Sequence, residues 1–427
     1  MRLNHYKVKV SGKVRRMIFS MSRAARRGVV WGRLGVLIAV VVAASPPAIA
    51  LSTVDFLASL SSSEAEQFQS WRAAKRQYDA KLDAYWERVD AKRQARKGKR
   101  AAKIAFESDD YVMTLPPSFD GPKLSPALAK KYETFIAEQA KSEPTPKKEM
   151  STVADYLAAA KSVYGFVPER ISEKEFKRRY AIEAHRLGIS KDQVVRIYAL
   201  ETGGIGTYDM QAGIHPIKKT GRAISSALGY AQLLDANSIN ELHKFGAEFL
   251  KRLNASASLP NIAPERASAL NRKLASLKKM YANVRAQPFE WGAQQAYAKT
   301  QPGMGVHAIN IDGDIGPMLQ AVKLRGLKDT AEKAGRSALS GAEMELMNLA
   351  GPATGLEMMQ PAGRNAPTTN FFARRAYYVN KMVIGLTGEG LLAELERRMD
   401  QAVKTPGSVE FAAAFDGVVQ GRVSAGQ

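Results

Sequence analysis

Apolar residues recur at helical spacing through most of residues 151–402, and this periodicity restricts the fold more than any other feature of the sequence. Because steps of three and four residues match the turn of a helix, such residues lie on one helical face. The patterns cover 153–164, 172–187, 190–202, 238–253, 264–286, 291–299, 316–323, 340–349, 371–386 and 390–402. Alternating apolar and polar residues, which are typical of strands, are nearly absent. The sequence therefore predicts a mainly α domain over 151–402, with at most a small β-hairpin after Glu201.

Glu201 is a carboxylate at a position where packing favours an apolar residue. Ser190 and Gln193 form a capping box that begins its helix, and Glu201 lies on the apolar stripe of Ile197 and Tyr198. Two glycines end the helix directly afterwards. Burial and the negative end of the helix dipole both disfavour a carboxylate, so the pattern predicts an acid that is protonated near neutral pH. A general acid for glycosidic bonds needs this property; the alternative is a Glu that reaches solvent or pairs with Arg or Lys.

The residues after Glu201 carry a second pattern. Thr202 comes next, then a glycine-rich turn, then the run Ser226-Ala227-Leu228-Gly229-Tyr230-Ala231-Gln232. This arrangement resembles the catalytic core of lysozyme-like lytic transglycosylases, in which a Glu closes a helix, a Ser or Thr follows it, and a Gly-x-x-Gln motif lines the sugar groove. The resemblance implies a lysozyme-like helical domain with Glu201 as catalytic acid. It also implies substrate contacts at Thr202, Gln211, Ser226, Gly229, Tyr230 and Gln232, and at Tyr378 as the family's late tyrosine.

The chain departs from the family pattern in two places. The spacing from Glu201 to Gly229 is longer than in the shortest members, with the insertion at residues 215–222. The Ala-Tyr-Asn-x-Gly motif that many members carry is not found, and its closest counterpart is Gln295-Ala296-Tyr297. The resemblance therefore leaves that wall of the groove undefined.

The reaction implied by the resemblance is cleavage of peptidoglycan between N-acetylmuramic acid and N-acetylglucosamine. One Glu protonates the leaving oxygen and then accepts the proton of the C6 hydroxyl, which gives a 1,6-anhydro end. An ordinary glycosidase uses two carboxylates, but the nearest candidate, Asp209, better fits a turn. Two alternatives remain open: a lysozyme that hydrolyses the same bond, and a catalytically silent envelope protein that binds peptidoglycan as a scaffold.

Metal sites and cofactors are not indicated. Cysteine is absent, which excludes disulfides and thiolate ligands, and no two of the five histidines lie three or four residues apart. Asn310, Asp312 and Asp314 have the spacing of a calcium loop, but Ile315 replaces the turn glycine and Ala321 the bidentate Glu. A polar turn is therefore expected at 310–314.

The charge balance indicates an anionic partner. The chain has 63 Lys and Arg against 41 Asp and Glu, a net charge of +22, and outside residues 1–50 there are still 53 basic residues. Such a charge suits a polyanionic surface. Nucleic acid is not expected, because the sequence has no recognised reading module and no aromatic stacking platform. Peptidoglycan glycan strands are the expected partner.

Residues 1–50 have the layout of a secretory signal peptide. Ten basic and no acidic residues lie in this segment, an apolar run covers 34–44, and Ala48-Ile49-Ala50 matches a cleavage site. The run is too short to cross a membrane comfortably, so a stable transmembrane anchor is not expected. Export to the periplasm or beyond, with removal of the signal, is the prediction.

Residues 51–150 are predicted to form a charged helix and a linker, and 403–427 a C-terminal tail. The helix covers 64–104 and carries a thin apolar stripe of Trp71, Tyr78, Leu82, Tyr85 and Val89. It packs on the main domain, binds a partner such as an envelope or secretion complex, or stays solvated. Proline-rich sequence at 109–146 indicates the linker, with one short helix near 127–139.

Overall fold

The computed structural model describes residues 53–142 and 150–421 and confirms a mainly α chain. These residues form seventeen α-helices, four 3-10 helices and no sheet. The expected signal peptide at 1–50 lies outside the described residues. Within the described residues, no helix combines the length and apolar character needed to cross a membrane.

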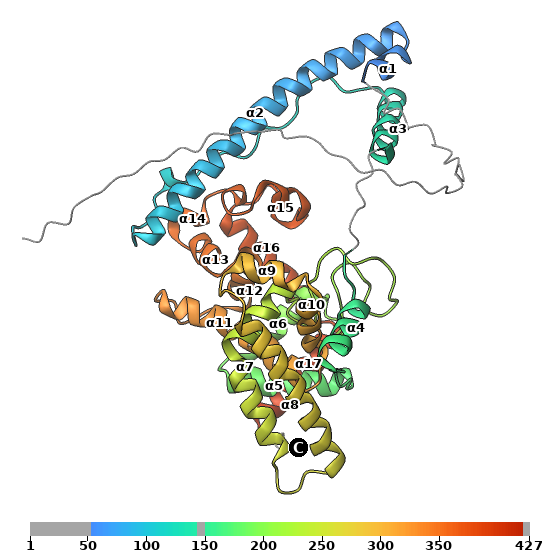
Figure 1. Ribbon diagram of the computed structural model, residues 1–427. Helices are drawn as coiled ribbons and strands as arrows, with labels where there is room; N and C mark the ends of the chain where they lie inside the picture. The colour runs from blue at the N-terminus through green and yellow to red at the C-terminus, as the bar shows by residue number, and fades with distance from the viewer. Residues whose placement is uncertain (1–52, 143–149, 422–427) are drawn as a thin grey trace, which may run out of the picture. The chain divides into compact units, whose positions relative to one another are not determined.

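The N-terminal part contains one long helix and two shorter ones (Figure 1). These are α1 (Thr53–Ala58), α2 (Ser62–Ala101) and α3 (Pro126–Ser142), with the 3-10 turn η1 (Ser108–Asp110) after α2. A capping box between Ser61 and Glu64 begins α2. A small aromatic and aliphatic cluster formed by Phe56, Phe68, Leu128 and Phe135 holds the three helices together.

The apolar stripe of α2 is covered by the chain itself. Leu82, Tyr85, Trp86 and Val89 are buried in the main hydrophobic core. The Tyr85 hydroxyl donates to the carbonyl oxygen of Thr114 at 2.9 Å. Of the three expectations for this helix, packing on the main domain is the one that the structure shows.

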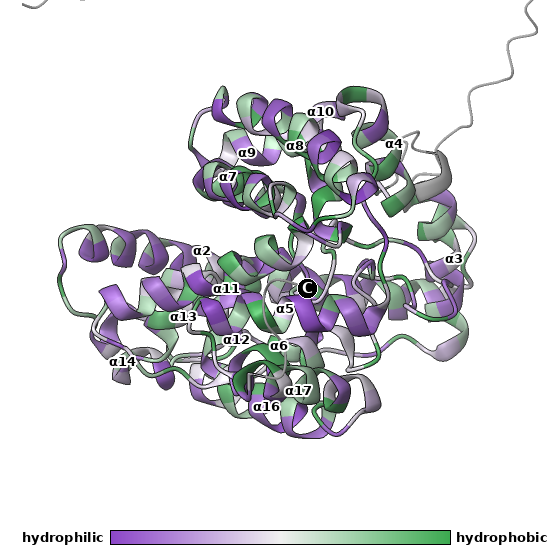
Figure 2. Cartoon of the chain, turned by 90° about the horizontal axis from the view of Figure 1, so that it is seen from below, coloured by the Kyte–Doolittle hydropathy of each residue, from purple (hydrophilic) through white to green (hydrophobic). Residues whose placement is uncertain are grey.

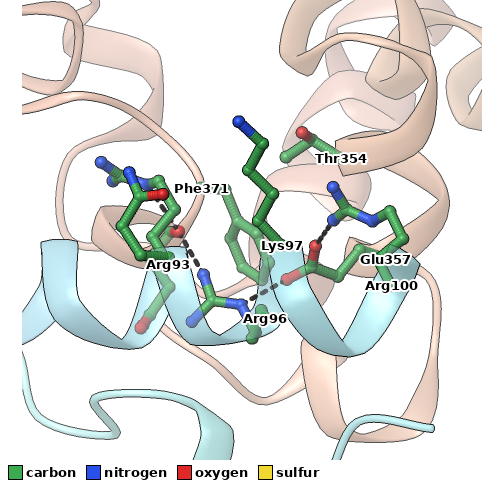
Figure 3. A pocket seen from close by; sticks show the side chains of 9 residues that line it. Arg93, Arg96, Lys97, Arg100, Thr354, Glu357 and Phe371 are labelled. Carbon is green, nitrogen blue, oxygen red and sulfur yellow. Dashed lines mark hydrogen bonds and ion pairs between the residues drawn. The ribbon is translucent and has the colours of Figure 1, made fainter. Parts of the chain in front are cut away.

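A buried ion pair fixes the C-terminal half of α2. Arg96 is only 2% exposed, and its Nε donates to Glu357 on α13 (Pro352–Met358) at 2.7 Å. Its two terminal nitrogens donate to the carbonyl oxygens of Asp110 and Asn370 at 2.8 and 2.7 Å. Figure 3 shows Arg96 and Arg100 approaching the Glu357 carboxylate from α2. Because a buried guanidinium needs such partners, this network specifies how α2 and α13 meet.

The remaining helices form the main domain. They are α4 (Val153–Tyr164), α5 (Glu173–Arg186), α6 (Lys191–Thr202), α7 (Asp235–Ala257), α8 (Pro264–Arg285), α9 (Trp291–Ala298), α10 (Gln301–His307), η2 (Ala308–Ile311), α11 (Ile315–Lys333), α12 (Gly341–Ala350), α14 (Pro361–Arg364), η3 (Thr368–Asn370), α15 (Arg374–Val379), η4 (Lys381–Val383), α16 (Gly388–Ala402) and α17 (Pro406–Val419). Helices α7 to α10 pack together with α4, while α6 packs against α12, α16 and α17. In Figure 2 the hydrophobic stretches of α6, α12 and α16 gather where these helices meet. One continuous core joins both groups.

Residues 406–419, expected to belong to a C-terminal tail, instead form α17. Phe411 and Phe415 on this helix are 0% and 4% exposed, and the Phe411 ring packs against Tyr180 and Tyr198. The burial of two phenyl rings stabilises a helix that sequence position alone suggested would fray.

The segment between α6 and α7 is irregular. In the described part of the chain the expected hairpin does not appear as paired strands; isolated antiparallel bridges join Gln211 to Leu228, Ile214 to Gly221 and Leu228 to Leu233. Side chains supply much of the remaining support. Gln211 donates to the carbonyl oxygens of Ser151 and Ser225 at 2.8 and 3.0 Å, which ties the segment to the start of α4.

Removing the Glu357 carboxylate tests the anchor of α2. We expect Glu357→Ala to lower the free energy of unfolding by about 3–5 kcal/mol, because Arg96 stays buried without its counter-charge. Asp83→Ala is the matched control, since it breaks an exposed ion pair between α2 and Arg374 and should cost less than about 1 kcal/mol. Urea denaturation measures both values, and equal small losses would contradict the assignment.

Candidate functional site

Glu201 lies in the last turn of α6. The Ser190–Gln193 capping box begins this helix, and Gly203 ends it in the left-handed conformation with φ 63°. Gly204 follows at φ 66°, and a Cβ at this position would overlap the Thr405 side chain between α16 and α17. Two glycines are therefore needed to turn the chain away while α6 stays packed against its neighbours.

The Glu201 side chain meets two polar side chains of α12. Its carboxyl shares a hydrogen bond with the carboxyl of Glu345. Asn348 Nδ2 donates to Glu201 at 3.1 Å and lies 3.4 Å from the Glu345 carboxylate. Glu345 is 2% exposed, whereas Glu201 keeps part of its surface accessible. The pair thus joins a buried Glu345 to a Glu201 that is partly exposed as a residue although its carboxyl is buried, and an amide bridges the two carboxyls.

Burial raises the pKa of both carboxyls. For Glu201 it is the largest effect, and hydrogen bonds from Glu345 and Asn348 partly offset it. The pKa of Glu345 is raised well above its usual value by burial, and the negative charge of Glu201 raises it further. Because two neighbouring carboxylates cannot both be ionised cheaply, both carboxyls keep their protons above the usual pH range of a Glu, and Glu345 is the last of the two to ionise.

A lysine of α11 influences the pair weakly. Lys323 on α11 lowers the pKa of Glu345, but this is the smallest of the effects on that group. Burial in turn lowers the pKa of Lys323, and the negative charge of the buried Glu241 on α7 partly offsets this effect. Nearby positive charge therefore offsets the raised pKa of Glu345 only in small part.

Sequence reasoning missed Glu345, although the signal was present. On the helix 340–349, Ala342, Leu346 and Leu349 lie three or four residues from Glu345 or from one another, so the carboxyl falls on an apolar stripe as Glu201 does. Asp209, the carboxylate weighed instead, binds Arg170 at 2.6 Å and Thr207 at 2.5 Å and supports the turn. Those interactions lower its pKa, so it is poorly suited to hold a proton.

The Gly-x-x-Gln motif forms a tight turn. Gly229 has φ 80°, and a Cβ there would lie 2.6 Å from Gln320 Nε2, so both the backbone and the space require glycine. Gln232 has φ 43° and donates to the carbonyl oxygens of Gly229 and Met210 at 2.8 and 3.3 Å. Both residues therefore shape the segment that follows Glu201.

Tyr230 and Thr202 are placed inside the protein. The Tyr230 ring is 0% exposed, packs against Tyr198 and Phe176, and its hydroxyl donates to Glu173. This ring contributes to the core and not to a groove, because it fills the space beneath α6. Thr202 donates to the carbonyl oxygen of Tyr198 at 2.6 Å and accepts from the Gly204 amide at 3.2 Å, which stabilises the end of α6.

The other motif residues are distributed more widely. Ser226 is buried, and its carbonyl oxygen accepts a hydrogen bond from His307 Nε2 at 2.8 Å. Gln211 is also buried, in the bonds to the start of α4. Tyr378 on α15 is 43% exposed and contacts Trp86 of α2, with ring centres 6.0 Å apart. Its contacts join it to α2 and not to Glu201.

The calcium-like turn at 310–314 is occupied by a lysine. Lys273 Nζ lies 2.9 Å from the Asp312 carboxylate and also pairs with Asp314 and Glu169. An ammonium group stands where a cation would have to bind, so the turn is a structural ion network. No group of three metal-ligating side chains occurs within 53–142 and 150–421.

Comparison with protein-family models, curated proteins and solved structures returned no match to this chain. The site is therefore interpreted from its own chemistry and from the motif at 190–234.

The pH dependence of stability tests the raised pKa of Glu345. Because the folded pKa of Glu345 is raised, its contribution to stability is complete below the unfolded pKa and is lost as pH rises through the folded pKa. We expect Glu345→Gln to leave the Tm nearly unchanged at pH 4 and to raise it at pH 8 by roughly 2–4 °C, the change that ~1 kcal/mol produces. Glu396→Gln removes an exposed carboxyl of α16 and should show no such difference. A lower Tm for Glu345→Gln at pH 8 would count against the assignment.

Proposed function

We propose that this protein is a lytic transglycosylase that cleaves the glycan strands of peptidoglycan within a lysozyme-like domain. The observation that carries the proposal is the carboxyl pair at the end of α6. Glu201 is partly accessible and has a raised pKa, and it is hydrogen-bonded to the inner acid Glu345. A carboxyl with a raised pKa, on a residue that is only partly buried, has two properties of a general acid.

In the proposed reaction, Glu201 first donates a proton to the substrate and later accepts one from it. Glu201 donates it to the oxygen that leaves N-acetylmuramic acid as the bond from C1 breaks, and the substrate's acetamido group stabilises the cationic centre. The C6 hydroxyl oxygen then bonds to C1, and its proton passes to the Glu201 carboxylate. The product carries a 1,6-anhydro ring, and the enzyme regains its starting protonation state without adding water.

Glu345 acts as a positioning residue in this proposal. It is too buried to touch a polymer, but it hydrogen-bonds to the Glu201 carboxyl, and Asn348 donates a hydrogen bond to Glu201 and lies close to Glu345. After Glu201 gives up its proton, these two groups stabilise the new carboxylate until the C6 proton arrives. The acid and base steps can then use the same side chain in one orientation.

The geometry of the pair favours a transglycosylase over an ordinary two-carboxylate lysozyme. Catalytic carboxyls lie about 5–5.5 Å apart in retaining enzymes and about 6.5–9.5 Å apart in inverting ones, with the sugar between them. Glu201 and Glu345 are hydrogen-bonded, which leaves no room for a sugar or a water between them. A reaction that uses one Glu and a group of the substrate fits this arrangement better.

The proposal also assigns substrate binding to the residues around Glu201 and to the surface charge. The backbone around Gly229 and the Gln232 amide would bind acetamido groups, and the basic surface would favour an acidic glycan-peptide mesh. The proposal needs no cofactor, and it places the protein in the periplasm or outside the cell after signal removal. Whether residues 64–104 also bind an envelope or secretion complex is a separate hypothesis.

Mass spectrometry of the fragments released from purified peptidoglycan tests the proposed function. The protein should release anhydro-ended muropeptides, and Glu201→Gln should reduce this by about 100-fold or more, because the general acid is lost. Glu173→Gln is the matched control, since it removes another carboxyl with a raised pKa that binds Tyr230 in the core. Reducing ends would indicate a lysozyme. If neither protein releases fragments but both sediment with the wall, the scaffold alternative replaces the proposal.

A further inference from the structure

A polar pocket, separate from the carboxyl pair, lies between the C-terminal half of α2, α13 and η3. Its volume is about 250 Å³. Figure 3 shows Arg93, Arg96, Lys97 and Arg100 reaching it from α2, with Thr354 and Glu357 contributed by α13. Four cationic side chains thus line one small cavity.

The positive charges of this pocket exceed the negative ones. Glu357 is the one carboxylate among the lining residues, and both Arg96 and Arg100 bind it. Arg93 pairs with Asp90, which lies outside the lining, at 2.6 Å. Four cations against two carboxylates leave an excess of two positive charges, so the pocket attracts an anion.

Two side chains retain unused hydrogen-bonding capacity. Lys97 is exposed, and it forms no ion pair or hydrogen bond with any residue in the described ranges. The Thr354 hydroxyl likewise has no hydrogen-bond partner there. In Figure 3 both side chains extend above the Arg96–Glu357 pair, one from each helix. An ion in the pocket could accept hydrogen bonds from both without breaking the existing contacts.

The cationic floor is held in place before any ligand arrives. Three nitrogens of Arg96 already donate hydrogen bonds, and its guanidinium lies over the Tyr111 ring at 4.4 Å from the centre. Rigid donors lose little entropy on binding, and the Arg and Lys groups suit an oxyanion. Free phosphate carries about −1.5 to −2 at neutral pH, which matches the charge excess better than a carboxylate does, and the phosphodiester of a lipid headgroup carries a single negative charge on the same kind of oxygens.

We propose that this pocket binds a phosphate group, presented either as free phosphate or on the headgroup of an anionic lipid. Lys97 and Thr354 would contact the phosphate oxygens directly, and the Arg96–Glu357–Arg100 group would supply the positive field beneath them. The proposal is independent of the peptidoglycan reaction.

Isothermal titration of the full chain with inorganic phosphate tests the site. Saturable binding is expected, and Lys97→Ala should weaken it about tenfold, the loss of one charge-assisted hydrogen bond. Lys97→Arg should bind nearly as well as the unchanged protein. Lys81→Ala removes an exposed lysine of the same helix, about 24 Å away by helical rise, and should have no effect. Both lysines are exposed, so neither change should alter the Tm.

The source of the phosphate is decided by sedimentation with vesicles of phosphatidylglycerol or of phosphatidylcholine. If Lys97→Ala alone sediments less with phosphatidylglycerol, and phosphate competes, the ligand is a lipid headgroup. If phosphate binds but Lys97→Ala and Lys81→Ala sediment equally, it is free phosphate. Absence of saturable phosphate binding, equal losses for Lys97→Ala and Lys81→Ala, or equal affinity for acetate would each overturn the proposal.

Discussion

The interaction that most constrains this molecule is the hydrogen bond between two buried carboxyls, Glu201 and Glu345. Burying one carboxylate in a helical core is unfavourable, and placing a second beside it is more so unless a proton lies between them. The packing of α6 against α12 brings the two groups together, and Asn348 supplies a donor. Such an arrangement stores free energy that a structural role alone would not require, which is why the pair is a candidate for catalysis.

Two other networks of buried charges follow the opposite rule. Arg96 meets Glu357, and Lys273 meets Asp312 and Asp314, so each cation faces anions and hydrogen bonds satisfy the rest. The first pair fixes how α2 packs against α13, and the second fixes how α8 packs against the turn before α11. The contrast between paired opposite charges and paired like charges separates the structural networks from the proposed site.

Periodicity predicted the helical class and Glu201 at the end of its helix, because both depend on local spacing and caps. It could not predict that Glu345 meets Glu201, since the two lie 144 positions apart and only tertiary packing joins them.

Tyr230 was expected in a groove because the motif places it beside Gly229, yet its ring fills the core under α6. Tyr378 was expected near the site, but its ring contacts α2, a packing choice that local pattern does not encode. Residues 406–419 were expected to be a tail because they lie near the end of the sequence. The burial of Phe411 and Phe415, which stabilises them as a helix, depends on tertiary packing that the local pattern does not encode.

The most direct test of the central claim is infrared spectroscopy of the carboxyl groups at pH 7, with glutamate labelled by carbon-13. We expect a labelled carbonyl band of protonated glutamate in the unchanged protein, and this band should weaken when Glu201 is replaced by glutamine and also when Glu345 is. Glu357→Gln, which alters a buried but ion-paired carboxylate, should leave the band in place. A band that Glu201→Gln leaves unchanged would contradict the proposed acid at Glu201, and full ionisation of every glutamate at pH 7 would contradict the protonated pair.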